Sequence, residues 1–271
     1  MPKTTAAPRA FPRLLIAFCL FLFVSGFFVV EFPDVEGASY ASYGFNLLIA
    51  LPAFMALVQQ LGALRGAVAL VVVSVFGYLI EGTGTATGFP YGQFHYGDAM
   101  GPRIFDHVPY LLPLSYVPLV IGAVAVVAGT RNVLARIALG GLLLVVIDGV
   151  LDPGAVSLGF WIWPGGGPYY GVPLSNYGGW LISGLIASAL LVLIGGRRLD
   201  RRVLRPGLLD SLLVSMFLWM GVCIFSGLVF PAVLAAALIV LVAWRRQQLV
   251  RVRARVGQPN TRTGAESITS S

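Results

Sequence analysis

Long apolar runs separated by short polar segments dominate this chain. The runs cover residues 14–30, 44–61, 64–81, 110–129, 133–150 and 179–195, and a last apolar region covers 208–244. Each run is apolar on all faces and long enough to cross a bilayer as a helix, at about 1.5 Å per residue. Gly221, Gly227 and Pro231 interrupt the last region, which predicts two helices joined by a tight turn. The expected fold is an all-α polytopic transmembrane bundle of about eight helices.

The two ends of the chain differ from these runs. Residues 1–13 predict a short basic tail before the membrane domain, which we place at 14–244. The tail and first run also resemble a secretory signal peptide, but the run is long and no A-x-A cleavage site follows, so we expect a retained helix. Residues 245–271 begin basic and end rich in Ser and Thr, which predicts a juxtamembrane basic stretch followed by a disordered end.

Composition supports a membrane protein. Hydrophobic residues make up 58% of the chain and charged residues 11%, whereas soluble domains carry about 25% charged residues. The mean hydropathy is +0.87. The net charge of +7 comes from arginines that lie in short runs between apolar segments. This arrangement is typical of topology signals and argues against nucleic-acid binding.

The basic residues predict the orientation. If the N-terminus is cytoplasmic, eight crossings leave only Arg103 of the 18 basic residues on the outer side. We therefore expect a multi-pass protein of the cell membrane with both termini cytoplasmic. The acids show the reverse distribution, and those mapping to the outer half are Glu31, Asp34, Glu36, Glu81, Asp98, Asp106, Asp148 and Asp152. The first three lie in a short loop and are expected to be solvated.

Two outer loops, residues 82–109 and 151–178, hold nearly all the unusual residues of the chain. Both are rich in aromatic residues, Gly and Pro, and such loops can fold back over helix ends and roof a cavity open to lipid. The alternative is an aromatic belt at the membrane interface. We expect the two loops to meet and to bring Glu81 close to Asp148 and Asp152.

Asp148 and Asp152 are four residues apart, which places them on one face of a helix, one turn from each other. Pro153 is expected to stop that helix. Two carboxyl groups so close near lipid cannot both ionise easily, so one is expected to keep its proton and act as a general acid beside a general base. The alternative is that Asp152 caps local backbone and Asp148 hydrogen-bonds a neighbouring helix.

Other polar residues give weaker signals. Glu81 closes the third apolar run, where an acid is either part of a site or exposed to water at the interface. His95 and His107 lie near acids but show no metal-binding motif, so no metal site is predicted. Cys19 and Cys223 lie in separate apolar runs and are expected to be packing residues.

The loop motifs resemble those of a known family. The first loop contains Glu81-x-x-Gly84-Thr85-x-Thr87-Gly88-x-Pro90-Tyr91-Gly92, then Tyr96, Gly101-Pro102, Val108-Pro109 and Pro113-Leu114. The second contains Asp148-x-x-x-Asp152-Pro153, Trp161-x-Trp163 and Tyr169-Tyr170-Gly171-Val172-Pro173-Leu174-x-Asn176-x-x-Gly179-Trp180. Over residues 70–180 the chain resembles the CruF-type carotenoid 1′,2′-hydratases, which include the bisanhydrobacterioruberin hydratases. Where we expect Ala-Trp after Pro-Leu, this chain has Ser115-Tyr116.

The resemblance implies an enzyme that adds water to the terminal C1′–C2′ double bond of an acyclic carotenoid and leaves a tertiary alcohol. Asp148 or Asp152 would donate the proton, and Glu81 or the other aspartate would act as base for water. The expected pocket residues are Tyr91, Tyr96, Trp161, Trp163, Tyr169 and Tyr170, with Asn176 holding a water or the product hydroxyl.

The implied partners are a linear carotenoid, membrane lipids and other enzymes of the carotenoid pathway, with no cofactor. Two alternatives stay open. A carotenoid cyclase would form the same carbocation and exclude water, and a carotenoid-binding or transport membrane protein would leave the carotenoid chemically unchanged. The products formed in a lycopene-producing host separate the three.

Overall fold

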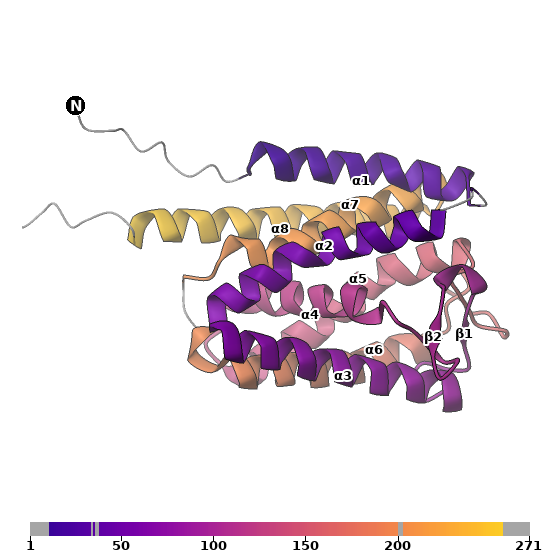
Figure 1. Ribbon diagram of the computed structural model, residues 1–271, viewed down its shortest axis with the longest axis horizontal. Coiled ribbons are helices and arrows are strands. Elements are labelled where there is room, and N and C mark those ends of the chain that lie inside the picture. The colour runs from indigo at the N-terminus through magenta and orange to yellow at the C-terminus, as the bar shows by residue number, and fades with distance from the viewer. Residues whose placement is uncertain (1–10, 34, 36–37, 200–202, 257–271) are drawn as a thin grey trace, which may run out of the picture.

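The computed structural model describes residues 11–33, 35, 38–199 and 203–256, which form eight α-helices (Figure 1). These are α1 (Arg13–Glu31), α2 (Ala38–Leu61), α3 (Ala63–Thr87), α4 (Leu112–Val127), α5 (Val133–Ser157), α6 (Leu174–Gly195), α7 (Asp210–Phe225) and α8 (Val229–Val256). Four two-residue strands are described, namely β1 (His95–Tyr96), β2 (Arg103–Ile104), β3 (Val108–Pro109) and β4 (Trp161–Ile162). Single 3-10 turns cover Asp98–Met100, Gly196–Arg198 and Pro206–Leu209. The prediction of an all-α bundle of about eight helices is confirmed.

The helices run side by side along the long axis of the molecule (Figure 1). α1 packs mainly against α7, and α5 packs mainly against α6. α4 lies at the centre, in contact with α2, α3, α5, α6 and α7. Its residues from Tyr116 to Ala125 are all buried. Because protein surrounds it, α4 can be only 16 residues long, which is shorter than the predicted run 110–129.

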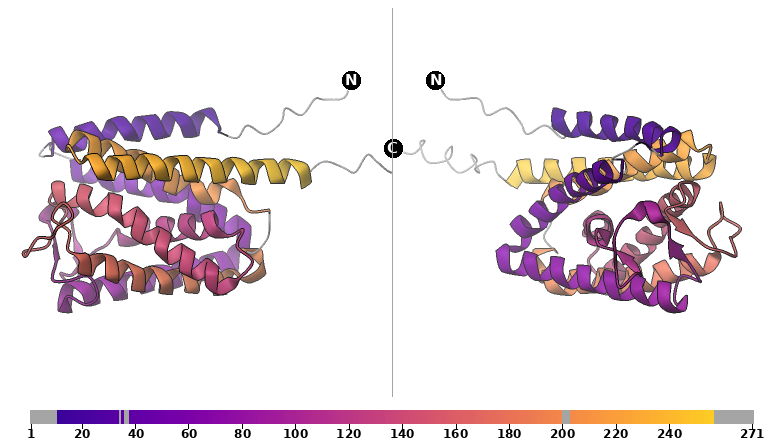
Figure 2. Two further views of the ribbon diagram at one scale, coloured as in Figure 1. Left: turned by 180° about the vertical axis from the view of Figure 1, so that it is seen from behind. Right: turned by 45° about the vertical axis from the view of Figure 1, so that its right-hand side comes forward.

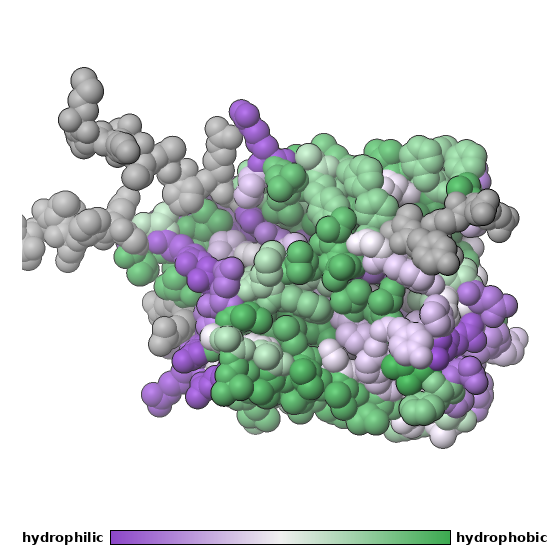
Figure 3. Space-filling model, viewed as in Figure 1, coloured by the Kyte–Doolittle hydropathy of each residue, from purple (hydrophilic) through white to green (hydrophobic). Residues whose placement is uncertain are grey.

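The outer faces of the bundle are apolar. Large hydrophobic side chains such as Val71, Leu193 and Val240 are more than half exposed, and hydrophobic residues cover the middle of the surface seen in Figure 3, with hydrophilic residues gathered toward its two ends. Seven of the described helices, all except α4, are long and apolar enough to cross a membrane. Exposure of so large an apolar surface to water would be unfavourable, whereas its contact with lipid chains carries no such cost. The protein is a multi-pass membrane protein.

The two ends of the bundle differ. α1 begins and α8 ends at the same end, and the strands lie at the other end (Figure 2). Arg131, between α4 and α5, and Arg198, after α6, belong to the end without strands, whereas Arg103 lies in β2. The two-ended distribution of basic residues predicted from the sequence is therefore present in the fold.

Several helices continue past the apolar runs that predicted them. α3 continues beyond residue 81 to Thr87, and α8 continues through the predicted basic tail to Val256. Arg246 is only 5% exposed, because its guanidinium pairs with the Asp210 carboxylate of α7, with 2.6 Å between Nε and Oδ1. The predicted tail residues 1–10, the acids Asp34 and Glu36, Arg201, Arg202 and the predicted disordered end 257–271 lie outside the described residues.

Candidate active site

Glu81 lies in the last part of α3 and is 6% exposed. The segment after it remains helical, and the hydroxyls of Thr83, Thr85 and Thr87 donate to carbonyls one turn earlier, which satisfies these polar side chains within the helix. Gly88, at a φ of 80°, then ends the helix in the left-handed conformation that favours glycine. The Glu81 carboxyl is thus enclosed by protein and accepts a hydrogen bond from the Tyr96 hydroxyl, at 3.0 Å. The alternative of a water-exposed interfacial acid does not hold.

Asp148 and Asp152 lie on one face of α5, and they are 1% and 3% exposed. The side-chain amide of Asn176, at the start of α6, joins them. Its nitrogen donates to Asp148 Oδ2 at 2.9 Å and also to Asp152 Oδ2. Asp152 Oδ1 accepts a third hydrogen bond from the Trp161 indole N–H, at 3.0 Å. Asp148 Oδ1 has no hydrogen-bond partner among the described residues.

Pro153 lies inside α5, so the prediction that it stops the helix was wrong. A proline removes the N–H that would bond to the carbonyl four residues earlier, which here belongs to Gly149. The Tyr169 hydroxyl donates to that carbonyl instead, at 2.9 Å. A side chain from the second loop therefore replaces the missing backbone donor, as happens at prolines within membrane helices. This bond holds the turn that carries both aspartates.

The two loops meet through an antiparallel pair of strands. β1 pairs with β4, and Tyr96 lies opposite Trp161, with ring centroids 6.2 Å apart in an edge-to-face arrangement. Gly97 permits this approach, since a Cβ there would overlap the Gly159 carbonyl. The donor to Glu81 and a donor to the aspartate pair are thus cross-strand neighbours. Glu81 and Asp152 lie close enough to interact electrostatically, as predicted for the meeting of the loops.

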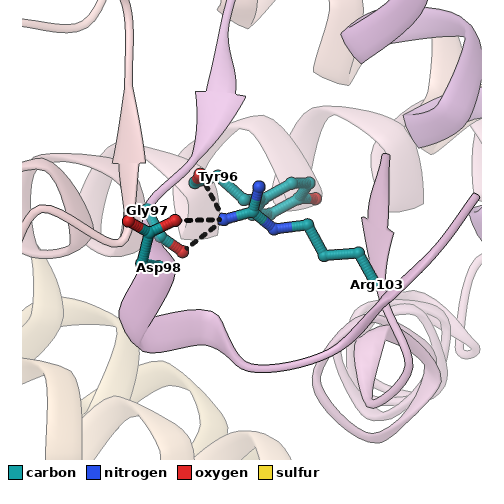
Figure 4. Close-up of polar contacts among 4 residues, drawn as sticks. All are labelled: Tyr96, Gly97, Asp98 and Arg103. Carbon is teal, nitrogen blue, oxygen red and sulfur yellow. Dashed lines mark hydrogen bonds and ion pairs between the residues drawn. The ribbon is translucent and has the colours of Figure 1, made fainter. Parts of the chain in front are cut away.

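Arg103 holds the first loop in place (Figure 4). Its guanidinium Nη2 donates to the carbonyls of Tyr96 and Gly97, at 2.8 and 2.9 Å, and pairs with the exposed Asp98 carboxylate, at 3.3 Å. β2 itself pairs with β3, which connects the loop back toward α4. Arg103, at the strand-bearing end of the bundle, therefore fixes the backbone that presents Tyr96.

Aromatic side chains cover the acids. The buried cluster consists of Tyr91, Phe94, Tyr96, Trp163 and Val172, with Trp161, Tyr177 and Trp180 packed against it. The Trp163 indole N–H donates to the Tyr91 carbonyl, at 3.2 Å, and the rings of Phe94 and Trp163 are 5.6 Å apart. Residues from both loops and from α6 therefore form an aromatic cluster that contacts Glu81 through Tyr96 and Asp152 through Trp161.

Comparison with known proteins shows the family to which the chain belongs. The sequence profile of a family described as "Carotenoid biosynthesis protein" matches residues 42–242, most of the 271-residue chain. The chain belongs to this carotenoid biosynthesis protein family. The chain is 41% identical over 181 residues to a protein of Haloarcula japonica named bisanhydrobacterioruberin hydratase. The match covers 64% of this chain and 61% of that protein, so less than two thirds of the relative's length is represented. No solved structure matches.

The matched region of this carotenoid biosynthesis protein contains Glu81, Asp148 and Asp152, together with both loops. The family resemblance read from the loop motifs is thereby confirmed. The roles of the individual residues stay predictions, and the structure shows where each one lies. Tyr91, Tyr96 and Trp163 are in the buried aromatic cluster, and Trp161 packs against it. Tyr169 lies beside it, with its ring 5.8 Å from that of Tyr177. Tyr170 is 41% exposed, and its ring meets that of Tyr169 in an edge-to-face arrangement, with centroids 5.1 Å apart.

The two histidines and two cysteines that the sequence analysis considered do not join the site of this carotenoid biosynthesis protein. His107 is exposed, and His95 is exposed in β1. In the described ranges of the chain, no group of three or more His, Cys, Asp or Glu side chains has the geometry of a metal site. Cys19 and Cys223 are buried free thiols.

Sequence reasoning missed some residues of the site. It identified Asn176 as a possible water ligand, but not as the amide that joins the aspartates. It also missed Tyr116 and Ser183, which lie inside apolar helices near Glu81. A tyrosine and a serine that interrupt otherwise apolar helices are the signal that could have marked them.

Proposed function

We propose that this protein adds water to the terminal double bond of an acyclic carotenoid end group and leaves a tertiary alcohol. The observation that carries the proposal is the burial of three carboxyl groups, Glu81, Asp148 and Asp152, beside a cluster of aromatic side chains. Hydration of an isolated alkene needs an acid, a means to stabilise a cation and a base for water. The name of the Haloarcula japonica relative supports the same reaction.

Asp148 is the proposed proton donor. Both Asp152 oxygens accept N–H donors, from Trp161 and Asn176, which suits an ionised carboxylate. Asp148 Oδ1 is buried without such a donor, so it can carry a proton. That proton adds to C2′, the π electrons form the new C–H bond, and a tertiary cation remains at C1′. The electron-rich faces of Trp161, Trp163 and the neighbouring tyrosines stabilise the cation.

Glu81 is the proposed base. As the oxygen of water bonds to C1′, the Glu81 carboxylate takes the released proton, and this proton returns to the aspartate pair to reset the site. Tyr96 orients Glu81 through its hydroxyl. Burial raises the pKa of Tyr96 well above its usual range, so it remains a donor at physiological pH. Addition of water changes no oxidation state overall, so the reaction needs no redox cofactor.

The substrate is a hydrocarbon dissolved in the bilayer, and the site lies at the end of a bundle whose outer faces are apolar. We propose that the carotenoid enters from lipid, with Tyr91, Tyr169 and Tyr170 beside its end group and Asn176 near the new hydroxyl. We also propose that the strand-bearing end faces away from the cytoplasm, with both termini cytoplasmic, on the positive-inside rule. A reporter fused after Val256 that reads as extracytoplasmic would contradict this orientation.

The test of the reaction is expression in a lycopene-producing host, with carotenoid products identified by mass. A gain of one water supports hydration. Ring formation without a gain in mass would indicate a cyclase, and the absence of any new carotenoid would indicate a binding or transport protein. At equal expression, Asp148→Asn should reduce hydration by orders of magnitude, because the amide has no transferable proton. Asp106→Asn, at an exposed loop position, is the matched control and should retain activity.

A further inference from the structure

Three hydroxyl groups from separate segments converge beside Glu81. They belong to Tyr91, in the loop after α3, Tyr116 of α4 and Ser183 of α6, and these residues are 1%, 3% and 0% exposed. Both tyrosine hydroxyls face the Ser183 hydroxyl and lie within electrostatic range of Glu81. Neither has a hydrogen bond of ordinary geometry to another described residue. Hydroxyl groups buried in an apolar bundle are costly unless something satisfies them.

The packing holds these hydroxyls in place. The Tyr91 ring fits between Gly84 and Gly179, where added Cβ atoms would lie 2.7 and 2.5 Å from ring carbons. The Tyr116 ring rests on Gly77, whose Cβ would lie 3.0 Å away. Neither tyrosine can therefore swing away to find another partner.

Trp180 and Ser183 complete the arrangement. The Trp180 ring lies 6.3 Å from the Tyr91 ring and 5.9 Å from the Tyr116 ring. The Ser183 hydroxyl faces the Trp180 carbonyl, at 3.5 Å, so its oxygen lone pairs are available to the two tyrosines. The three hydroxyls form a polar spot in otherwise apolar surroundings.

The chemistry of this spot fits water. Buried waters make about three hydrogen bonds, to polar groups that otherwise lack partners. Hydroxyl groups both donate and accept, and the Glu81 carboxylate adds an acceptor. A hydrocarbon end group could not satisfy any of them. A divalent cation would require more oxygen ligands and more negative charge than three hydroxyls and one carboxylate supply.

We propose that Tyr91, Tyr116 and Ser183, together with Glu81, bind the water molecule that is added to the carotenoid. This inference rests on the proposed hydration. The water oxygen forms the bond to C1′, and its proton passes to Glu81 as that bond forms. Protonation by the aspartate pair and capture by water are then served by different groups. Loss of the water site should leave protonation intact and impair capture alone.

The test separates these steps with deuterium. The full-length protein in detergent is supplied with lycopene in D2O, and both the hydrated product and the recovered lycopene are measured by mass spectrometry. A cation that is not captured loses a proton from C2′ and returns to the alkene, sometimes with deuterium in place of hydrogen. In the Ser183→Ala and Tyr116→Phe variants, hydration should fall tenfold or more. The ratio of deuterated recovered lycopene to hydrated product should rise in both variants.

Ser188→Ala is the matched control. Ser188 is a fully buried serine that lies in the same helix as Ser183 and packs against Gly140 of α5, and its replacement should change neither readout. If hydration is unchanged in both test variants, or if deuterium exchange falls in parallel with hydration, the water site is refuted. If the wild-type protein neither hydrates lycopene nor exchanges deuterium, the proposed reaction itself fails, and the water site fails with it.

Discussion

The hydrogen bond from Tyr169 to the Gly149 carbonyl gives the sharpest test of how the second loop supports the site. Tyr169→Phe removes one hydroxyl and keeps the ring, which packs against Tyr177 and Phe230. The Gly149 carbonyl then has no donor, because Pro153 cannot supply the usual helical N–H. The turn between Asp148 and Asp152 should become less stable.

The magnitude follows from the nature of the bond. An acceptor left unpaired in a buried position costs about 1–3 kcal/mol. Hydrogen bonds between membrane helices measured by double-mutant cycles average about 0.6 kcal/mol and reach about 1.7 kcal/mol. The 2.9 Å bond to a buried carbonyl belongs toward the upper end of the second range. We expect Tyr169→Phe to lower the free energy of unfolding by about 1–2 kcal/mol.

The assay is a double-mutant cycle in detergent, with unfolding followed by denaturant titration. Pro153→Ala restores the backbone N–H that can bond to Gly149, so Tyr169→Phe should cost less than about 0.5 kcal/mol in that background. Tyr170→Phe is the matched control, because Tyr170 is 41% exposed beside Tyr169, and it should be nearly neutral. An equal cost of Tyr169→Phe with and without Pro153 would refute the reasoning.

Three further outcomes are expected. Gly179→Ala places a Cβ 2.5 Å from the Tyr91 ring and should cost about 1–3 kcal/mol in unfolding experiments, whereas Gly178→Ala meets nothing within 4 Å and should be neutral or slightly stabilising. Trp161→Phe removes the N–H that donates to Asp152 of the aspartate pair. It should reduce kcat/KM for hydration by about 10- to 100-fold at equal expression, as expected for loss of a hydrogen bond to a charged group. Unchanged kinetics would contradict this role of Trp161. Burial raises the pKa of Tyr169 to about 12, above an unfolded value of about 10, so its contribution to stability is complete below pH 10 and is lost as the pH rises through about 12. Unfolding measured across that window should show a smaller fall in Tyr169→Phe than in wild type.

The sequence determined much of this protein because lipid leaves few choices. An apolar run of about twenty residues in a bilayer must satisfy its backbone internally, so the runs predicted the helices almost one for one. The distribution of arginines indicated which helix ends lie together. The spacing of Asp148 and Asp152 placed them on one helical face, and the loop motifs indicated the family. These are local properties, and they can be read along the chain.

Tertiary structure decided the rest, because it depends on contacts between distant segments. Pro153 reads locally as a helix stop, yet the helix continues because the Tyr169 hydroxyl takes the place of the missing N–H. Asn176 joins two aspartates more than twenty residues away. The pairing of Tyr96 with Trp161 sets the position of Glu81 relative to the aspartates. No pattern within one segment encodes such partners, since each is selected by the packing of the whole bundle.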